Sequence, residues 1–360
     1  MKITIMKNDE RRVKNLFGRL LLSVLVMASL AGCRKDLCYN HDEHALKVQA
    51  DVDPEWMQEW ENPYTGGEMQ FDWAAIWEEQ GWPREYDEFR PEIADGIRSI
   101  VYTEGAEPAV SNLENYGGLI SMSEGVHALL FYNNDTEYII FDNTDNSATA
   151  TASTRTRTRG GYTAPQNHED ERTITPPDNL YASYVPAYLA EKSLVSDELP
   201  VTMFPRTFTY LIRYHITSGL QYVSQARGAL AGMAERVYLN DGHTDATTAT
   251  LLFDCKVDEK GCTAEVLCFG VPNFAYKTNE YTDDPEKMHF MLRLDVLLKN
   301  GKLLTFDRDI SEPMRLQPRG GILVFDDIEI SDEDGMEGAG GFDPDVDDWG
   351  DEIDIPLPIN

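Results

Sequence analysis

Apolar and polar side chains alternate along residues 44–53, with Leu46, Val48, Ala50 and Val52 on one face and polar residues between them. A period of two is typical of a half-buried β-strand. The same signal returns at 97–102, 126–132 and 138–141, and the last two runs are joined by a turn composition at 133–135. The first half of the chain is therefore predicted to be antiparallel β-structure.

The second half contains two predicted hairpins. The first joins 251–257 to 262–270, with Val257 opposite Cys262 and one face wholly apolar. The second joins 288–298 to 302–310 around Lys299-Asn300-Gly301. A two-residue turn would set Leu294 opposite Asp307, whereas a three-residue loop with a left-handed Gly301 sets Leu294 opposite Phe306. The apolar pairing favours the three-residue loop.

Weaker patterns complete the prediction. Residues 322–330 form another strand, and 351–357 alternate but contain Pro356, which confines them to a sheet edge. Residues 147–161 are predicted to be a polar edge strand, and 74–79 and 226–235 to be short helices. The fold class is all-β, with two antiparallel β-sandwich domains and short helices in loops.

This pattern suggests a domain organisation. We expect an N-terminal sandwich at 44–161 with a Trp-rich insert at 55–96, a linker at 162–178, and a C-terminal sandwich at 179–360. At about 150 residues per domain, two domains also suit the length of the chain.

The N-terminus predicts the location of the protein. Residues 1–32 combine a basic start, a short apolar run and the sequence Leu30-Ala31-Gly32 before Cys33. That run is too short to span a membrane and fits a secretory signal. Small residues before a cysteine form a lipobox, so we predict cleavage before Cys33, its acylation, and a lipid-proximal tether at 33–43. An ordinary signal peptide with a chance cysteine is the alternative.

Charge restricts the partners. The chain has 31 Lys and Arg against 63 Asp and Glu; without residues 1–32 it keeps 25 basic and 61 acidic groups, a net charge of −36. Nucleic acid and anionic lipid surfaces both need a basic face, so neither is an expected partner of the folded chain. The predicted membrane partner is outer-membrane lipid, reached through acylated Cys33, with the protein exposed at the cell surface.

Two residue sets are candidate ligand sites. Trp73 and Trp77, within a group that includes Trp56, Trp60 and Trp82, could form a stacking platform for sugar rings, although such residues more often fill a core.

Asp343, Asp345 and Asp347 have the spacing of a calcium loop. Gly350 and Asp354 depart from that pattern, which leaves a solvated acidic loop as the alternative.

Signals for chemistry are otherwise weak. Cys255, Cys262 and Cys268 are read as buried apolar side chains or, alternatively, as partners in a disulfide. Arg155, Arg157 and Arg159 suggest an exposed strand face or a site for an Arg-specific protease. No catalytic signature is present, so we expect neither an enzyme nor a cofactor, and no metal site is assigned from Cys38, His41 and His44, which lack a fourth ligand.

Three stretches carry a resemblance to a known family: 34–41 directly after the lipobox, the small-residue segment 226–234, and the Gly- and Asp-rich segment 340–351. The chain resembles Bacteroidales surface lipoproteins of a domain-of-unknown-function family, which are similar to fimbrillin-like FimB/Mfa-type fimbrial anchor and accessory subunits.

The resemblance implies two transthyretin-like sandwiches, a role in adhesion or fimbrial anchoring, fimbrial subunits as partners, and no catalytic residues. A glycan-binding surface lipoprotein that uses the Trp-rich insert is the alternative function. Related subunits lend a strand to a neighbour. An anchor at the base of a fimbria has no need to lend one, so we expect 351–358 to pack as an edge strand on its own second domain.

Overall fold

The computed structural model describes residues 48–58, 82, 90–193, 195–336 and 353–354. Their regular secondary structure is almost entirely β, as predicted. The α-helices among them are α3 (Ser311–Leu316) and α4 (Asp332–Met336), and the 3-10 turns are η2 (Leu220–Tyr222) and η3 (Pro285–Lys287). The fold class expected from the period-two patterns is therefore confirmed.

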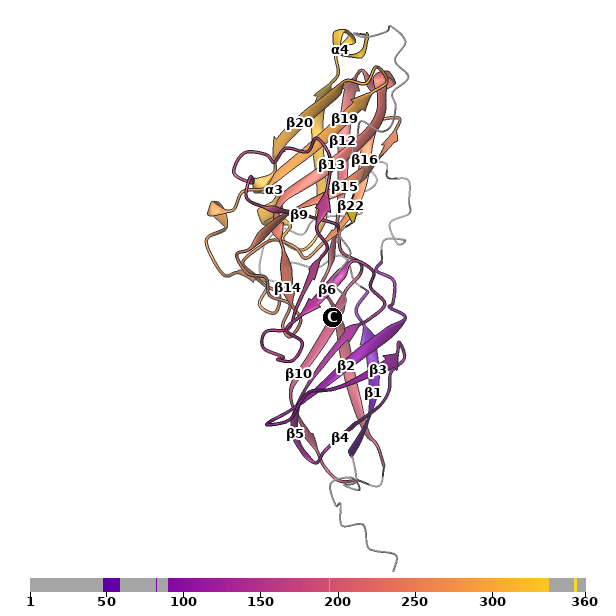
Figure 1. Cartoon of the computed structure of the whole chain (residues 1–360), viewed down its shortest axis with the longest axis vertical. Helices are drawn as coiled ribbons and strands as arrows, with labels where there is room; N and C mark the ends of the chain where they lie inside the picture. The colour runs from indigo at the N-terminus through magenta and orange to yellow at the C-terminus, as the bar shows by residue number, and fades with distance from the viewer. Residues whose placement is uncertain (1–47, 59–81, 83–89, 194, 337–352, 355–360) are drawn as a thin grey trace, which may run out of the picture. The chain divides into compact units, whose positions relative to one another are not determined.

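Seven strands form the first large sheet, in the order β3-β2-β5-β10-β11-β1-β4 (Figure 1). Their bounds are β1 Val48–Trp56, β2 Gly96–Thr103, β3 Ala109–Glu114, β4 Gly118–Met122, β5 Gly125–Asn133, β10 Tyr181–Ala190 and β11 Asp197–Pro205. The predicted alternation of β1 is seen directly, because Val48, Ala50 and Val52 are buried and the residues between them are exposed.

This sheet folds into two layers at β10 and β11. These strands pair only at Tyr181–Pro205 and Ala182–Phe204 and then separate. The layer β11-β1-β4 and the layer β3-β2-β5-β10 share one core, to which Val52 and Val201 come from the first layer and Phe131 from the second. The result is a β-sandwich.

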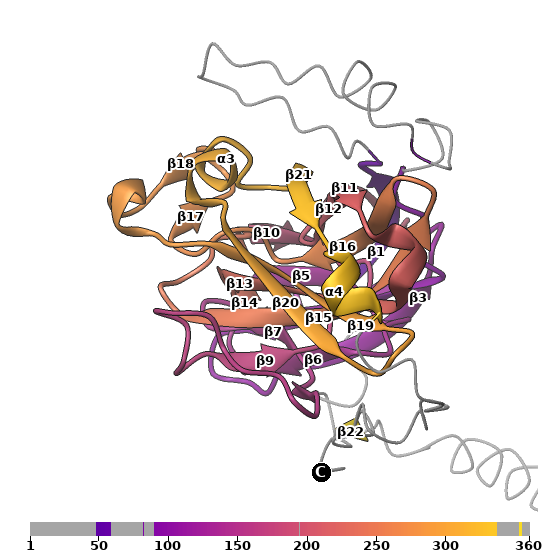
Figure 2. The ribbon, with the colours of Figure 1, turned by 90° about the horizontal axis from the view of Figure 1, so that it is seen from above.

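The second large sheet follows the path β20-β19-β13-β15-β16-β12-β21, with β9 also paired to β15. Its bounds are β9 Arg172–Ile174, β12 Phe208–Ser218, β13 Val223–Ala234, β15 Thr248–Asp258, β16 Gly261–Cys268, β19 Met291–Leu298, β20 Leu303–Asp309 and β21 Gly321–Glu329. Figure 2 shows β21, β12 and β16 on one side and β20, β19 and β15 on the other.

The predicted hairpin 251–270 forms, with a difference in its outer part. Val257 pairs with Cys262 as expected, but the ladder runs only from Lys256 to Asp258 on the first strand. Beyond it β15 pairs with β13 and β16 pairs with β12. The two apolar faces therefore meet across the core of a second sandwich, not along one ladder.

The predicted hairpin 288–310 is confirmed in its register. Leu294 pairs with Phe306 and Val296 with Leu304. Gly301 has φ +85°, the left-handed conformation that the three-residue loop requires. Local turn chemistry together with apolar pairing was enough to define this element.

A small sheet, β14-β7-β6, lies beside both sandwiches. Its strands are β6 Ile139–Asp142, β7 Thr151–Thr154 and β14 Arg236–Tyr238. The prediction of a polar edge strand over 147–161 is wrong for β7, which pairs on both sides and buries Ala152 and Thr154. Its threonines and alanine are small enough to lie in a core, so polarity did not mean exposure.

The strand pairing corrects the expected boundary between the two halves. β10 and β11 follow residues 162–178 in sequence but belong to the first sheet, and the second sheet begins at β12. Residues 162–178 are not an exposed linker, because β9 pairs with β15 and both His168 and Ile174 are buried. The sequence of residues 162–178 has no periodic pattern that would have predicted this long-range pairing.

The predicted helix at 226–235 is also wrong. These residues lie in β13, which pairs with β15 on one side and β19 on the other. Gly228 to Ala234 are buried without interruption. A central strand covered on both faces loses the period of two, which is why its small residues resembled a helix.

Four short strands remain, in two pairs. β17 (Phe274–Ala275) pairs with β18 (Glu280–Tyr281). β22 (Ile353–Asp354) pairs antiparallel with β8 (Arg157–Thr158). The rest of the predicted terminal strand and the predicted helix at 74–79 lie outside the described residues.

Candidate functional site

The residues predicted to carry function lie outside the part of the chain that the structure describes. They are Cys33, Trp73, Trp77, Asp343, Asp345 and Asp347. Lipid attachment, the glycan platform and the calcium loop therefore remain predictions. Within the described residues there is no group of three potential metal ligands and no helix long and apolar enough to span a membrane.

Two tryptophans from the predicted platform are described, and both are packed inward. The Trp56 ring meets Tyr181 edge to face at 5.0 Å, and its Nε1 donates to the Asn115 carbonyl at 2.9 Å. Trp82 is 8% exposed and lies under the Arg213 guanidinium, 5.1 Å from the ring centroid. For these two residues the interpretation as core-filling side chains is correct, and the interpretation as a sugar-stacking platform is wrong.

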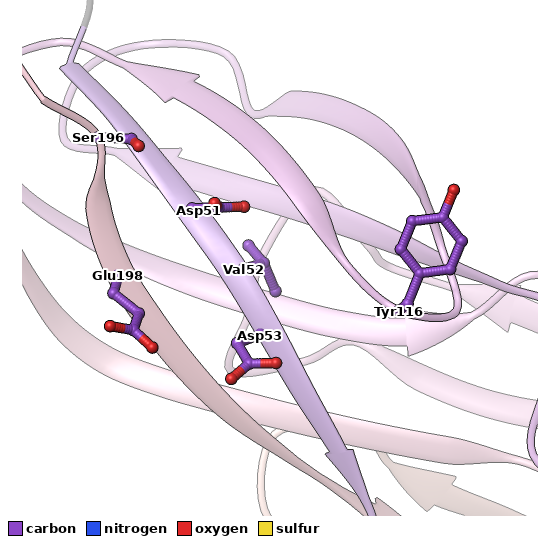
Figure 3. Close-up of a pocket in the computed structure, with 6 residues that line it drawn as sticks. All are labelled: Asp51, Val52, Asp53, Tyr116, Ser196 and Glu198. Carbon is purple, nitrogen blue, oxygen red and sulfur yellow. The ribbon is translucent and has the colours of Figure 1, made fainter.

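A shallow acidic depression lies on the outer face of the first sandwich (Figure 3). Asp51 and Asp53 project from β1 and Glu198 from the adjacent β11, where Asp51 and Glu198 are directly paired; Tyr116 closes one side. The depression has a volume of about 310 Å³ and its lining contains no basic residue. Its acidic lining would repel anions. No other feature of the depression indicates a particular ligand.

Most of the exposed large apolar side chains among the described residues lie on the first sandwich. Val126 of β5 and Leu189 of β10 are cross-strand partners, and 61% and 57% of their surfaces are exposed. Val110 and Leu119, on the outermost strands β3 and β4, are also more than half exposed. Val110 and Leu119 lie on edge strands, where exposed apolar residues are features of a surface that contacts another protein, whereas β5, which carries Val126, is paired on both sides.

The edges themselves are partly blocked. β10 pairs only with β5 beyond Ala182, and its register shifts between Val185 and Tyr188. Pro186 lies in that irregular segment and has no N–H to donate. β3 and β4 each have one described partner strand and are only five or six residues long. Short strands and prolines limit uncontrolled pairing between chains.

The three described cysteines are free and buried or half-buried. Burial raises the pKa values of the Cys262 and Cys268 thiols to about 12, so they are protonated at neutral pH. Cys255 is also raised well above its ordinary range by burial. The apolar-residue interpretation fits these contacts, and no disulfide joins the three.

The arginines at 155–159 hold the small strands onto the second sandwich. Arg157 donates to the Leu252 carbonyl at 2.9 Å, and its Nη2 lies 3.0 Å from the Asp254 carboxylate. The Arg159 side chain is 3% exposed and its Nη2 donates to the Gly228 and Phe253 carbonyls. The interpretation as an exposed strand face is therefore wrong. A sequence pattern cannot show that a long side chain spans a sheet.

These features define a class of protein: an all-β, two-sandwich chain with blunted edges and apolar positions gathered on the first sandwich. Residues 85–254 match the model of a family described as "Domain of unknown function (DUF5119)".

The chain is also similar to a named relative. It is 20% identical over 325 residues to the "Putative fimbrium anchoring subunit Fim4B" of Bacteroides ovatus, with 83% of this chain and 91% of that protein covered. The resemblance to fimbrial anchor proteins is thereby confirmed.

Solved structures are similar to the chain as well. A "putative adhesin from Bacteroides ovatus" has a TM-score of 0.55 at 17% identity, over 80% of this chain and 94% of that one, which shows a shared fold. The "fimbrial anchor protein Mfa2 from Porphyromonas gingivalis" has a TM-score of 0.40 at 9% identity, over 77% and 90% of the two chains.

Proposed function

We propose that this chain is a lipid-anchored, cell-surface structural protein that serves as a fimbrial anchor or accessory subunit. The observation that carries the proposal is the similarity to a fimbrium anchoring subunit over most of both chains. The apolar positions on the first sandwich support a role in contacting other subunits. The sequence Leu30-Ala31-Gly32-Cys33 supports attachment to outer-membrane lipid.

Catalysis is not part of this proposal. The fold and the relative belong to structural surface proteins, and the described titratable clusters are occupied by structural contacts such as Arg159 with Asp295. The partners are other fimbrial subunits and membrane lipid.

In the structure β22 pairs with β8 in a two-stranded sheet separate from the second sandwich, so Ile353 and Asp354 are not the expected edge strand of that sandwich. The C-terminal segment is nevertheless proposed to stay on its own chain. The pairing of Ile353 with Thr158 and of Asp354 with Arg157 supports this, because β8 is itself tied to β15 through Arg157. Pro356 and Pro358 each remove a ladder donor, which suits a cap better than a strand that is repeatedly lent to a neighbour.

The anchor is tested with Cys33→Ser, and Cys38→Ser serves as the matched control five residues away. We expect the first variant to accumulate as unprocessed precursor and to lose lipid labelling, while the control is processed normally. Fimbriae should then be shed into the medium only from cells that carry Cys33→Ser. Normal processing of Cys33→Ser would contradict the lipid anchor.

The partner is tested by cross-linking on intact cells, followed by capture of the chain and identification of attached proteins. Recovery of fimbrial subunits with the native chain supports the proposal. Firmly attached fimbriae in cells that lack the chain, together with no cross-linked subunit, would rule out the anchoring role.

A further inference from the structure

The outer face of the layer β3-β2-β5-β10 is covered over only part of its length. On β5, Phe131 lies in the core of the first sandwich, whereas Leu130 and Tyr132 belong to the cluster shared with the small sheet. Since side chains alternate along a strand, the even-numbered residues of β5 lie on the outer face. Val126 and Ala128 continue this series but are not part of the covered cluster.

The uncovered part of this face is apolar. Val126 pairs with Leu189 of β10, and both are more than half exposed. Ala128 pairs with the half-buried Tyr102 of β2, and Val110 of β3 is paired with a residue of the covered cluster and so shares its face. These five residues form the open face. The solvated side of an antiparallel sheet is normally polar, so an apolar band there indicates a contact with another protein.

The open face offers side chains and not a free strand edge. β5 is paired with β2 and β10, and β2 is paired with β3 and β5. A partner cannot therefore add a strand at Val126 or at Tyr102. It would pack apolar side chains against the face, as one β-sheet does on another.

Acidic side chains border the open face. Glu104 follows β2 in the same alternation as Tyr102, and Glu191 directly follows β10. Asp145 is next to Thr144, whose carbonyl accepts a hydrogen bond from the Tyr102 hydroxyl at 2.7 Å. In the part of the chain that the structure describes, Glu104, Asp145 and Glu191 form no salt bridge. Lys192, at the same end of β10, is already paired with Glu124 at 2.8 Å.

We propose that the open face docks a fimbrial subunit of different sequence, whose contact surface is apolar at its centre and carries lysine or arginine at its border. This rests on the anchoring role proposed above and names the surface that the role uses. A second copy of this chain would bring the same acidic border, and the whole chain is strongly acidic, so like charges oppose self-association. Anionic lipid is opposed for the same reason.

The test measures binding of isolated fimbriae to the immobilised mature chain by surface plasmon resonance. The fimbriae come from cells of the same strain in which this chain is deleted, so that their anchor-binding ends are free. Leu189→Arg places a positive charge in the open face and should raise the half-saturating fimbrial concentration about 10-fold or more, which is the size expected when one buried leucine is lost from an interface.

The matched control is Leu303→Arg on β20 of the second sandwich, where the leucine is 47% exposed. It should bind fimbriae like the native chain, and both arginine variants should keep the native thermal stability. Val126→Thr retains a β-branched side chain and serves as the milder variant; it should weaken binding about 2- to 5-fold.

The acidic border is tested by Glu104→Gln combined with Glu191→Gln. This pair should weaken binding about 2- to 10-fold at low salt, and the difference should vanish at about 0.5 M salt, because exposed charges are screened. Glu312→Gln combined with Glu329→Gln, on the second sandwich, is the control and should have no effect.

The outcomes separate the surface from the anchoring role. If the native chain binds fimbriae and Leu189→Arg and Val126→Thr bind them equally well, the open face is not the docking surface, although the anchoring role stands. If the native chain does not bind fimbriae, the anchoring role fails and the docking surface fails with it. Self-association of the native chain in sedimentation, lost in Leu189→Arg, would assign the face to a second copy and overturn the proposal.

Discussion

Arg159 joins three strands through one side chain. Its Nη2 donates to the Gly228 and Phe253 carbonyls of β13 and β15, and its Nη1 lies 3.7 Å from the Asp295 carboxylate of β19. Burial raises the pKa of Asp295, and Arg159 opposes that rise. Once Arg159 is removed, the buried Asp295 carboxylate has lost one of its two neighbouring cations and keeps only Arg293.

Arg159→Met is expected to lower the free energy of unfolding at pH 7 by about 3–5 kcal/mol, because one partner of a buried ion pair is left. A carboxyl with a raised folded pKa stabilises the fold at low pH and loses that contribution as pH rises through the pKa. The penalty should therefore be smaller at pH 5. Urea unfolding at both pH values measures this loss of stability, with the exposed Lys287→Met as control. Equal stability of Arg159→Met and the native chain would contradict the structural role of Arg159.

Glu171 is a second buried carboxylate, but its partners hold it ionised. Burial by itself would raise its pKa; hydrogen bonds from His168 at 2.8 Å, from Thr250 at 2.7 Å and from the Gly232 N–H at 3.1 Å bring the pKa below its ordinary 4.5. These bonds fix the 162–178 segment on β13 and β15.

A lowered carboxyl pKa contributes stability above the unfolded value, and that stability is lost as pH falls through the folded pKa. We expect the native chain to lose stability below about pH 4.3 and Glu171→Gln to lose less over that range, from a lower starting value at pH 7. Thermal melts from pH 7 to pH 3 measure the difference. Glu107→Gln, on an exposed loop, is the control, and parallel pH profiles for the native chain and Glu171→Gln would refute the assignment.

At the scale of elements, β13 depends on small residues. A Cβ at Gly228 would lie 2.0 Å from Cε2 of Phe253, its partner on β15, so the aromatic ring covers the glycine directly. The uninterrupted burial from Gly228 to Ala234 leaves little room for the ring to move.

Gly228→Ala should therefore destabilise the second sandwich by about 1–3 kcal/mol through overpacking. Combined with Phe253→Leu, which removes the covering ring, its effect should be smaller than the sum of the two single changes. Chemical denaturation measures both, and Ser224→Ala on the exposed start of the same strand is the control. Strict additivity would mean that the ring is not the constraint.

At the scale of the whole described chain, one hydrophobic cluster connects the two sandwiches. It takes Ile100, Leu130 and Tyr132 from β2 and β5, Val237 from β14, and Phe269 from directly after β16. The small sheet strengthens the connection, because β14 pairs with β7. Elements that share a buried core tend to unfold together.

Phe269→Ala is expected to cost about 3–5 kcal/mol and to lower the stability of both sandwiches at once. Calorimetry should show one transition in the native chain and in the variant. Hydrogen exchange should accelerate in β5 and in β13 alike, while Val257→Ala at the partly exposed turn should have a smaller effect. Two separate transitions, of which only one moves, would show that the sandwiches unfold independently.

The two predicted hairpins mark the limit of local sequence. Gly301 and the apolar pairs around it determine a turn and a register over a dozen residues, because turn chemistry and period-two burial act between near neighbours. The pairing of Val257 with Cys262 follows from the same rules. The prediction of the all-β class and of the strands in the first half depends on the same two local signals, turn residues and period-two alternation.

Sheet membership was decided by long-range pairing that leaves no local trace. β10 pairs with β5, and β11 pairs with β1 in parallel, although both follow the expected linker. β13 is buried on both faces, so its small residues lost the alternation by which β1 was recognised. The burial of Arg159 and of Arg206 depends on which strands meet, which no spacing of residues encodes.

The sequence by itself determined the fold class, the register of one hairpin, and the prediction of a lipid-anchored surface protein from residues 1–33. Only the tertiary structure decided which strands form each sandwich, that 162–178 pack as part of the second, and that the Arg159 guanidinium is buried beside Asp295. The reason is physical: alternation and turn residues report contacts between neighbours, whereas cavities and buried charges arise where distant segments meet.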